Sequence, residues 1–314
     1  MWNAVAVGSG LDEFACCTLP ILARIPSCEP DRVAPMVYNR SIMANADMDQ
    51  PAFLVIDTES VPDGKLLSLV KYPGEGLSPE EAVRRAQQEA SERSLTGSDF
   101  LPVTFHIPVA ACVLRAGADY TLQALTCLDA PNFRPRKIVE AFWSGVASYH
   151  AKYRGKIRLI TFNGRGFDLP LLELAAFRYG LSSKDHFSYS RRRYDGWHLD
   201  IMDWLTNFGA YRVVGGLNLL SKLLGKPGKM TVQGDQVYAM HQAGKLQEIN
   251  DYCMFDTLDS YFVFLRTRVL SGDLTLEQEQ ESVHRAKEWL KNKTSEFPAL
   301  AQYLDNWGDW QPWP

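Results

Sequence analysis

The sequence lacks the cysteine and histidine patterns that hold structural zinc. Its six cysteines form no CxxC pair and no His/Cys spacing suited to that metal. We therefore expect reduced, mostly buried thiols, which are typical of a cytoplasmic protein. Long apolar runs are missing too: none approaches the roughly 20 residues that span a bilayer, so we expect no membrane contact.

An excess of positive charge is also missing. The chain has 33 Lys and Arg residues against 37 Asp and Glu residues, which gives a net charge of −4 at pH 7. Proteins that bind nucleic acid are often strongly basic. Any such contact would here require a local basic patch, or metal ions that cancel carboxylate charge.

The first 47 residues differ in composition from the rest of the chain. They hold half of the cysteines and scattered prolines without a sustained hydrophobic period, so we predict that 1–47 is a poorly ordered extension. Two acidic residues and no basic residue precede its apolar stretch, which argues against a secretory signal. Met48 directly precedes the first predicted strand and is a candidate start of the native chain.

Hydrophobic periodicity and turn residues predict five strands with flanking helices. The predicted strands are 53–57, 106–115, 120–128, 157–162 and 197–200. The predicted helices are 78–93, 135–153, 169–179, 217–224, 235–242, 247–270 and 275–291. Ser78, Pro79 and Glu81 should begin the first helix with a capping box, and Gly180 should end the third. Strands 106–115 and 120–128 should pair as an antiparallel hairpin, and Pro62-Asp63-Gly64 should form a turn. Three leading strands followed by alternating elements indicate an α/β domain over 48–272, with a mixed sheet between helices. Residues 273–314 would add a C-terminal helix and a tryptophan-rich tail.

The first chemical motif is Asp57-Thr58-Glu59, at the end of the first predicted strand. Residues i and i+2 of a strand point to the same face, so both carboxylates can converge on one point. Two adjacent carboxylates repel each other, and a divalent cation between them relieves the repulsion. Chance predicts about one DxE in this sequence, so the position at a strand end carries the signal, not the count.

The second motif runs from Asn163 to Phe167 and Asp168, directly after the fourth predicted strand. This pattern is expected about 0.03 times by chance, which makes it a strong signal. Its two glycines permit a tight turn close to a ligand. The alternative is that Asp168 only caps the following helix.

The third motif is Tyr252 with Asp256, within the longest predicted helix. Spacing of i and i+4 puts the phenol and the carboxylate on one helical face. Chance predicts about 0.9 such pairs, so the motif is weak alone. None of the six histidines has an aspartate four residues later, so Tyr252 has no rival in this role.

In this order the three motifs resemble those of the proofreading 3′–5′ exonuclease superfamily, the DEDD type in its tyrosine subclass. They are most similar to the exonuclease domain of family B DNA polymerases. The stretch from Leu217 to Lys229 resembles the helix and loop between the second and third motifs of predicted stand-alone exonucleases. The resemblance covers roughly 53–270, and it implies an RNase H-like α/β fold with a mixed five-stranded sheet.

The resemblance also implies roles for individual residues. Asp57, Glu59, Asp168 and Asp256 would be catalytic carboxylates that bind two divalent ions, with Asp57 shared by both, and Tyr252 would orient the attacking water. All-oxygen ligands select Mg²⁺ or Mn²⁺ over zinc. The residues expected to contact substrate are Thr58, Asn163 and Phe167. For the Phe167 ring, stacking on a base and packing in the core remain alternatives.

The predicted function is therefore 3′–5′ hydrolysis of single-stranded nucleic acid, with DNA favoured, by two-metal-ion catalysis. Two alternatives remain: a non-catalytic nucleic-acid-binding module of the same fold, and a small-nucleotide phosphodiesterase. Asp200 and Asp203 are expected to be structural, with Asp200 starting a helix. The basic run Arg191–Arg193 is interpreted as a solvated loop in preference to a phosphate contact.

The composition of the N-terminal extension generates a first prediction. Deletion of residues 1–47 should leave the melting temperature and the nuclease activity nearly unchanged, because this segment is expected to bury little apolar surface. Thermal unfolding and an oligonucleotide assay on the full-length and shortened proteins would test this. A fall in melting temperature of more than about 5 °C would mean that the extension packs on the domain.

Overall fold

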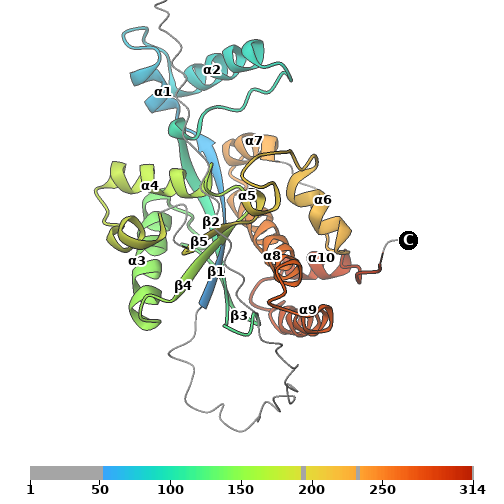
Figure 1. Ribbon diagram of the computed structural model, residues 1–314. Coiled ribbons are helices and arrows are strands. Elements are labelled where there is room, and N and C mark those ends of the chain that lie inside the picture. Colours follow the sequence, from blue (N-terminus) through green and yellow to red (C-terminus); the bar gives the residue numbers. More distant parts are fainter. Residues whose placement is uncertain (1–51, 192–195, 231–233, 313–314) are drawn as a thin grey trace, which may run out of the picture. The chain divides into compact units, whose positions relative to one another are not determined.

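The computed structural model describes residues 52–191, 196–230 and 234–312. Its centre is a five-stranded sheet in the order β3-β2-β1-β4-β5 (Figure 1). The strands are β1 (Ala52–Pro62), β2 (His106–Ala116), β3 (Leu122–Cys127), β4 (Ile157–Thr161) and β5 (His198–Asp200). Strands β1, β2 and β3 pair antiparallel, whereas β4 runs parallel to β1 and β5 runs parallel to β4. The sheet is therefore mixed, with β1 at its centre.

Helices and short helical turns connect the strands and follow them. The α-helices are α1 (Gly64–Val70), α2 (Pro79–Arg93), α3 (Pro135–Lys152), α4 (Asp168–Tyr179), α5 (Ile201–Leu205), α6 (Gly216–Leu223), α7 (Val237–Gln242), α8 (Leu246–Leu270), α9 (Leu276–Lys291) and α10 (Leu300–Asp305). Short 3-10 turns are η1 (Val103–Phe105) and η3 (Gly234–Gln236), and η2 (His186–Ser190) is a π-turn.

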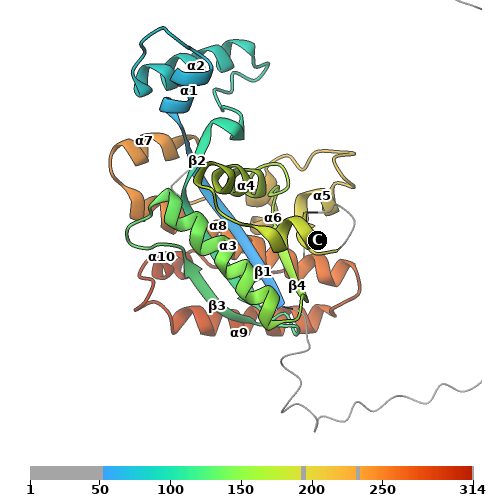
Figure 2. The same cartoon turned by 90° about the vertical axis from the view of Figure 1, so that its left-hand side faces the viewer.

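The alternation of side chains along β1 explains the layered arrangement. Phe53 and Val55 pack with α8 in one hydrophobic cluster, whereas Leu54 and Ile56 pack with α3 and α4 in another. Successive residues of a strand point to opposite faces, so an uninterrupted apolar run requires cover on both sides. Helices α3 and α4 provide it on one face and α8 on the other, as the two perpendicular views show (Figures 1 and 2).

The predicted fold class is confirmed: the domain is an RNase H-like α/β fold with a mixed five-stranded sheet flanked by helices. The predicted antiparallel hairpin is present as β2 and β3. Helix α2 begins with a capping box in which the Ser78 hydroxyl accepts from the Glu81 backbone and the Glu81 carboxylate accepts from the Ser78 backbone. Gly180 ends α4 in the left-handed conformation.

Three expectations need correction. The first strand was predicted to end at Asp57, but β1 continues to Pro62, so Asp57 and Glu59 lie within the strand and not at its end. The segment Pro62–Gly64, expected to be a simple turn, leads into helix α1, because the Asp63 carboxylate accepts from the Leu66 backbone and caps it. The C-terminal tail also contains α10, and Trp307 beyond it packs at 4.9 Å from Phe262. The prediction for 1–47 lies outside the described residues, as do Arg192 and Arg193.

Asp200 has the expected structural role at the start of α5. Its carboxylate accepts hydrogen bonds from the backbone of Met202 and Asp203. Arg191 forms an ion pair with Glu173 at 3.2 Å. Within the described residues, no helix combines the length and the apolar character needed to cross a bilayer.

A buried histidine on β5 generates a prediction on the pH dependence of stability. The Nε2 atom of His198 lies 2.8 Å from the Thr161 hydroxyl, with which it shares a hydrogen bond. Burial lowers the pKa of His198 from 6.5 to about 3. The folded protein thus keeps this imidazole neutral between those values while the unfolded chain protonates it, so acidification favours the unfolded state. Between pH 6.5 and pH 5 the loss should be about 2 kcal/mol.

Urea titrations of the wild type and of His198→Gln at several pH values would measure this. The difference between the two free energies of unfolding isolates His198, because all other titrating groups are common to both proteins. His284→Gln, which changes an exposed histidine of α9, is the matched control and should follow the wild type. Parallel pH curves for wild type and His198→Gln would contradict the prediction.

Candidate active site

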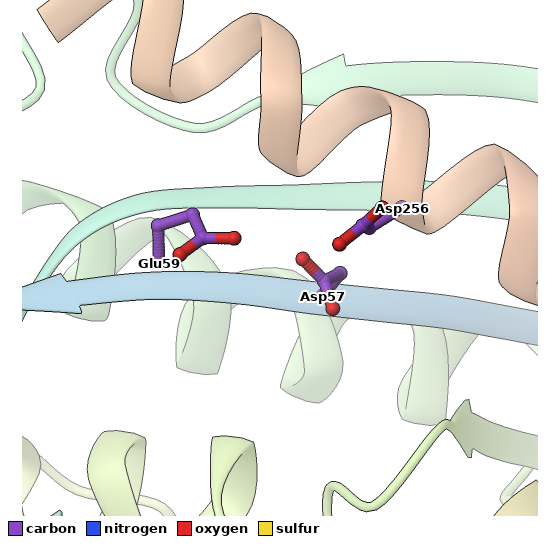
Figure 3. A group of neighbouring side chains, drawn as sticks. All are labelled: Asp57, Glu59 and Asp256. Atoms are coloured by element: carbon purple, nitrogen blue, oxygen red, sulfur yellow. The ribbon is translucent and has the colours of Figure 1, made fainter. Parts of the chain in front are cut away.

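Two distant segments bring three carboxylates together. Asp57 and Glu59 extend from the same face of β1, and Asp256 extends from α8, which covers that face (Figure 3). A carboxylate oxygen from each residue lies within 4.8 Å of the others. Spacing of i and i+2 along β1 accounts for the first pair, and the packing of α8 on the sheet adds the third.

The electrostatics of this acidic cluster, Asp57, Glu59 and Asp256, is unfavourable in the absence of a cation. Burial, followed by the neighbouring negative groups, raises the pKa of Asp57 and of Glu59 well above the usual range. Burial also raises the pKa of Asp256 to about 6, although a hydrogen bond from Tyr252 opposes the shift. The Asp57 Oδ2 atom is buried without a hydrogen-bond partner. Such an arrangement favours either protonation or a bound cation.

Asp168 approaches this region from the α4 side of the sheet. Its carboxylate accepts a hydrogen bond of 2.6 Å from the hydroxyl of Thr58, the residue between Asp57 and Glu59 on β1. Burial raises the pKa of Asp168 to about 7, and the Thr58 hydrogen bond opposes that shift. Asp168 is not one of the three carboxylates within 4.8 Å, but its charge contributes to the raised pKa values of Asp57 and Glu59.

The alternative role of Asp168 as a helix cap does not match the geometry. Phe167 occupies the N-cap position of α4 without a capping side-chain hydrogen bond, and Asp168 is the first helical residue. Its carboxylate is instead directed to Thr58. The second motif therefore delivers a buried acidic group to the strand that carries the first motif.

Asp200 holds the loop that presents Asp168. Its two carboxylate oxygens accept from the backbone N–H groups of Asn163 and Arg165, at 2.9 and 2.8 Å. Gly164 packs so closely that a Cβ atom there would lie 2.4 Å from the Thr161 side chain. The loop is thus clamped on β5 and β4, which explains why a glycine is required at 164.

Tyr252 lies one helical turn before Asp256, as the i and i+4 spacing predicts. The side chain is buried, with 7% of its surface exposed. Its pKa is raised, first by burial and then by the charges of Asp256, Glu59 and Asp57. The phenol therefore stays protonated at physiological pH and can donate a hydrogen bond beside the carboxylates.

The three residues expected to contact substrate differ in their surroundings. Thr58 is buried and its hydroxyl donates to Asp168, whereas Asn163 is exposed. The half-buried ring of Phe167 lies 5.8 Å from the exposed ring of Phe100. Phe167 therefore has an aromatic neighbour at the surface, and all three substrate contacts stay predictions.

One basic residue near the cluster received no role from the sequence. Lys229 is exposed, and its positive charge lowers the pKa values of Glu59 and Asp256. Its backbone N–H donates to the Asn218 side chain at 2.8 Å, which anchors the loop after α6. The sequence feature that could have pointed to Lys229 is its position in the glycine- and proline-rich loop between the second and third motifs.

The donor set fits a hard divalent cation. The three converging side chains offer only carboxylate oxygens, which Mg²⁺ and Mn²⁺ prefer, and no histidine nitrogen or cysteine sulfur. The unpartnered Asp57 oxygen is directed into a buried, negatively charged environment. Asp57, Glu59 and Asp256 could therefore hold such an ion.

Comparison with known proteins completes the description. A search of curated proteins gives no match. Among solved structures, the zinc-bound E. coli ExoI–ssDNA complex is similar with a TM-score of 0.32 and 12% identity, over 82% of this chain and 43% of that chain. A product-bound exonuclease I structure gives a TM-score of 0.31 and 11% identity, over 70% of this chain and 44% of that chain. The chain thus spans less than half of the length of either.

A family model provides the decisive match. The model is described as a predicted 3′–5′ exonuclease related to the exonuclease domain of PolB, and it matches residues 98–307, more than half of the chain. The matched region contains Asp168, Tyr252 and Asp256 and begins after the β1 carboxylates. The chain belongs to this family of predicted 3′–5′ exonucleases related to the PolB exonuclease domain.

Proposed function

We propose that the protein is a 3′–5′ exonuclease that hydrolyses single-stranded nucleic acid, with DNA favoured, by two-metal-ion catalysis. The observation that carries the proposal is the convergence of Asp57, Glu59 and Asp256 within 4.8 Å. These residues come from two segments separated by about 200 residues, and holding like charges together in a half-buried position opposes stability. Such an arrangement is typical of a site that binds divalent ions for catalysis.

The positions of the carboxylates support the metal-binding roles that the resemblance implies. Glu59 and Asp256 lie on the same side of the sheet as Asp57. Asp168 lies on the α4 side, where it accepts a hydrogen bond from Thr58, the residue next to Asp57. We assign Asp57 to both ions, Glu59 and Asp256 to the first, and Asp168 to the second. When bound, the two ions would activate a water molecule and offset the charge that develops on the leaving oxygen.

Tyr252 and Lys229 would complete the site. The Tyr252 phenol remains protonated and lies beside Asp256, so it can position the attacking water by a hydrogen bond. The Lys229 ammonium lies near Glu59 and Asp256, where it can attract the phosphate to be cleaved. Lys229 alone is not a basic patch, so the bound ions would supply most of the positive charge that contact with nucleic acid requires here.

The cavity beside Tyr252, lined also by Gly228, Met230 and Phe255, has a volume of about 150 Å³ and is not lined by the acidic cluster, so it does not define the substrate site. Retention of all four carboxylates and the tyrosine argues against one alternative, a binding module without turnover.

A direct assay tests the proposal. With Mg²⁺ or Mn²⁺ the protein should shorten a 5′-labelled single-stranded oligonucleotide from its 3′ end, and a chelator should stop the reaction. Asp57→Asn should abolish both turnover and tight Mn²⁺ binding, because the shared charged ligand is lost. Denaturing gels on DNA and RNA oligonucleotides, together with calorimetric Mn²⁺ titration, provide the measurements.

The matched control is Asp305→Asn, which removes an exposed carboxylate on α10 outside the acidic cluster. It should retain wild-type cleavage and Mn²⁺ binding. Cleavage that persists in Asp57→Asn, or a wild-type protein that leaves every oligonucleotide intact with both metals, would refute the proposed function.

Tyr252→Phe separates water positioning from metal binding. The phenyl ring can keep its packing, so Mn²⁺ binding and fold should be retained, whereas the rate should fall by about 10²–10⁴-fold. Single-turnover cleavage at saturating Mg²⁺ would measure the effect.

The control for the loss of a buried hydroxyl is Tyr261→Phe on the same helix. The Tyr261 hydroxyl donates to the Tyr120 carbonyl, away from the carboxylates, so its removal should cost about 1 kcal/mol of stability and leave the rate unchanged. Wild-type speed in Tyr252→Phe would exclude the phenol from the mechanism.

A further inference from the structure

Three cysteines lie against the acidic cluster on the α8 side of the sheet. Cys112 belongs to β2, Cys127 ends β3 and Cys253 belongs to α8. In the described part of the chain all three are free thiols. The Cys253 thiol donates to the backbone oxygen of Asp57 at 3.3 Å, and it also hydrogen-bonds with Cys112. The thiols thus form a continuous path from β3 to the backbone of a proposed metal ligand.

Cys112 and Cys127 have the geometry of a disulfide precursor. They are direct partners in the antiparallel pairing of β2 with β3, and their sulfur atoms lie 3.5 Å apart. Direct partners in antiparallel strands have Cα atoms about 4.5–5.5 Å apart, which falls within the range of disulfide-bonded cysteines. Closure to an S–S bond of about 2.05 Å therefore requires the sulfurs to approach by roughly 1.5 Å.

The two thiols differ in accessibility and reactivity. Cys112 is completely buried, whereas Cys127 is half-buried at the end of its strand. The hydrogen bond from the Cys112 thiol lowers the pKa of Cys127, and burial raises the pKa of Cys112. Thiolate character and access determine which thiol reacts with an oxidant. Cys127 is therefore suited to react first, with Cys112 in position to resolve the product.

We propose that Cys127 and Cys112 form a redox-active pair, which a hydroperoxide converts to a disulfide that impairs the neighbouring acidic cluster. The Cys127 sulfur attacks the peroxide, so that an S–O bond forms, the O–O bond breaks and water leaves after protonation. The Cys112 sulfur then attacks the sulfenic sulfur, an S–S bond forms, the S–O bond breaks and a second water leaves. Two thiols are oxidised by loss of two hydrogen atoms, and hydrogen peroxide is reduced to two water molecules.

The strand register connects this pair to the metal-binding region. Cys112 is the direct partner of Asp57 in the pairing of β1 with β2. Closure of the disulfide pulls the Cys112 sulfur toward β3 and away from Cys253, which supports the Asp57 backbone. Catalytic groups tolerate displacements of only about 0.5 Å. Disulfide formation should therefore displace Asp57, and its effect on cleavage rests on the proposed nuclease function.

The experiment uses the full chain with Cys16, Cys17 and Cys28 replaced by serine, so that only the three thiols of this cluster remain. Metal-free protein is treated with hydrogen peroxide, quenched with catalase, alkylated and digested for mass spectrometry. A peptide pair joined through Cys112 and Cys127 should appear and should disappear after dithiothreitol. The oxidised protein should bind Mn²⁺ more weakly by electron paramagnetic resonance, and its cleavage should fall on the order of 10²-fold.

Cys127→Ser in the same background is the matched control. It should form no Cys112 cross-link, and the same peroxide treatment should leave its Mn²⁺ binding unchanged; Cys127→Ala replaces it if serine disturbs β3. Cys112 and Cys127 recovered as separately alkylated peptides after treatment would overturn the proposal. So would a disulfide that leaves Mn²⁺ binding intact. A reduced protein without nuclease activity would refute the proposed function alone, because the peptide map and Mn²⁺ binding still decide the redox inference.

Discussion

Mutual repulsion among half-buried carboxylates is the constraint on which the arrangement of this protein depends. Asp57, Glu59 and Asp256 are held within 4.8 Å, and burial raises the pKa of each. No local segment could maintain such a cluster, because each carboxylate would turn toward water. The sheet and α8 hold the backbone of both segments through apolar packing, so the carboxylates cannot separate without disrupting the core.

The surrounding polar contacts restrict the elements that carry the carboxylates. Asp200 accepts from the backbone of the loop that leads to Asp168. One turn beyond Asp256, the buried carboxylate of Asp259 accepts a hydrogen bond of 2.6 Å from Tyr303 on α10. This contact connects the C-terminal segment to the helix that bears Tyr252 and Asp256. The geometry of the site therefore depends on residues that never approach a substrate.

The thiols beneath Asp57 belong to the same supporting layer. A cysteine side chain is small enough to pack between β2, β3 and α8 without separating the helix from the sheet. The hydrogen bond from Cys253 to the Asp57 backbone oxygen satisfies an acceptor at the position where the acidic cluster begins. Core side chains, the acidic cluster and the cysteines therefore lie together where β1, β2 and α8 pack against one another.

Local signals in the sequence were sufficient to predict the elements and the spacing of the motifs. The capping box at Ser78, the glycine after α4 and the apolar run of β1 each act within a few residues, and each appears where expected. The i, i+2 spacing of Asp57 and Glu59 follows from strand geometry alone. Helix α1 escaped prediction because Asp63, which initiates it, is equally common in turns.

Contacts between distant segments required the tertiary structure. The hydrogen bond from Thr58 to Asp168 joins residues that are 110 positions apart in the sequence, and the one from Cys253 to the Asp57 backbone joins residues 196 positions apart. The proximity of Lys229 to the carboxylates, and of Cys112 to Cys127, arises in the same way, from loop anchoring and strand register. A sequence pattern states which face a side chain takes within its own element. Which other element lies opposite that face is determined by the packing of the whole core, because burial of apolar surface has no direction of its own.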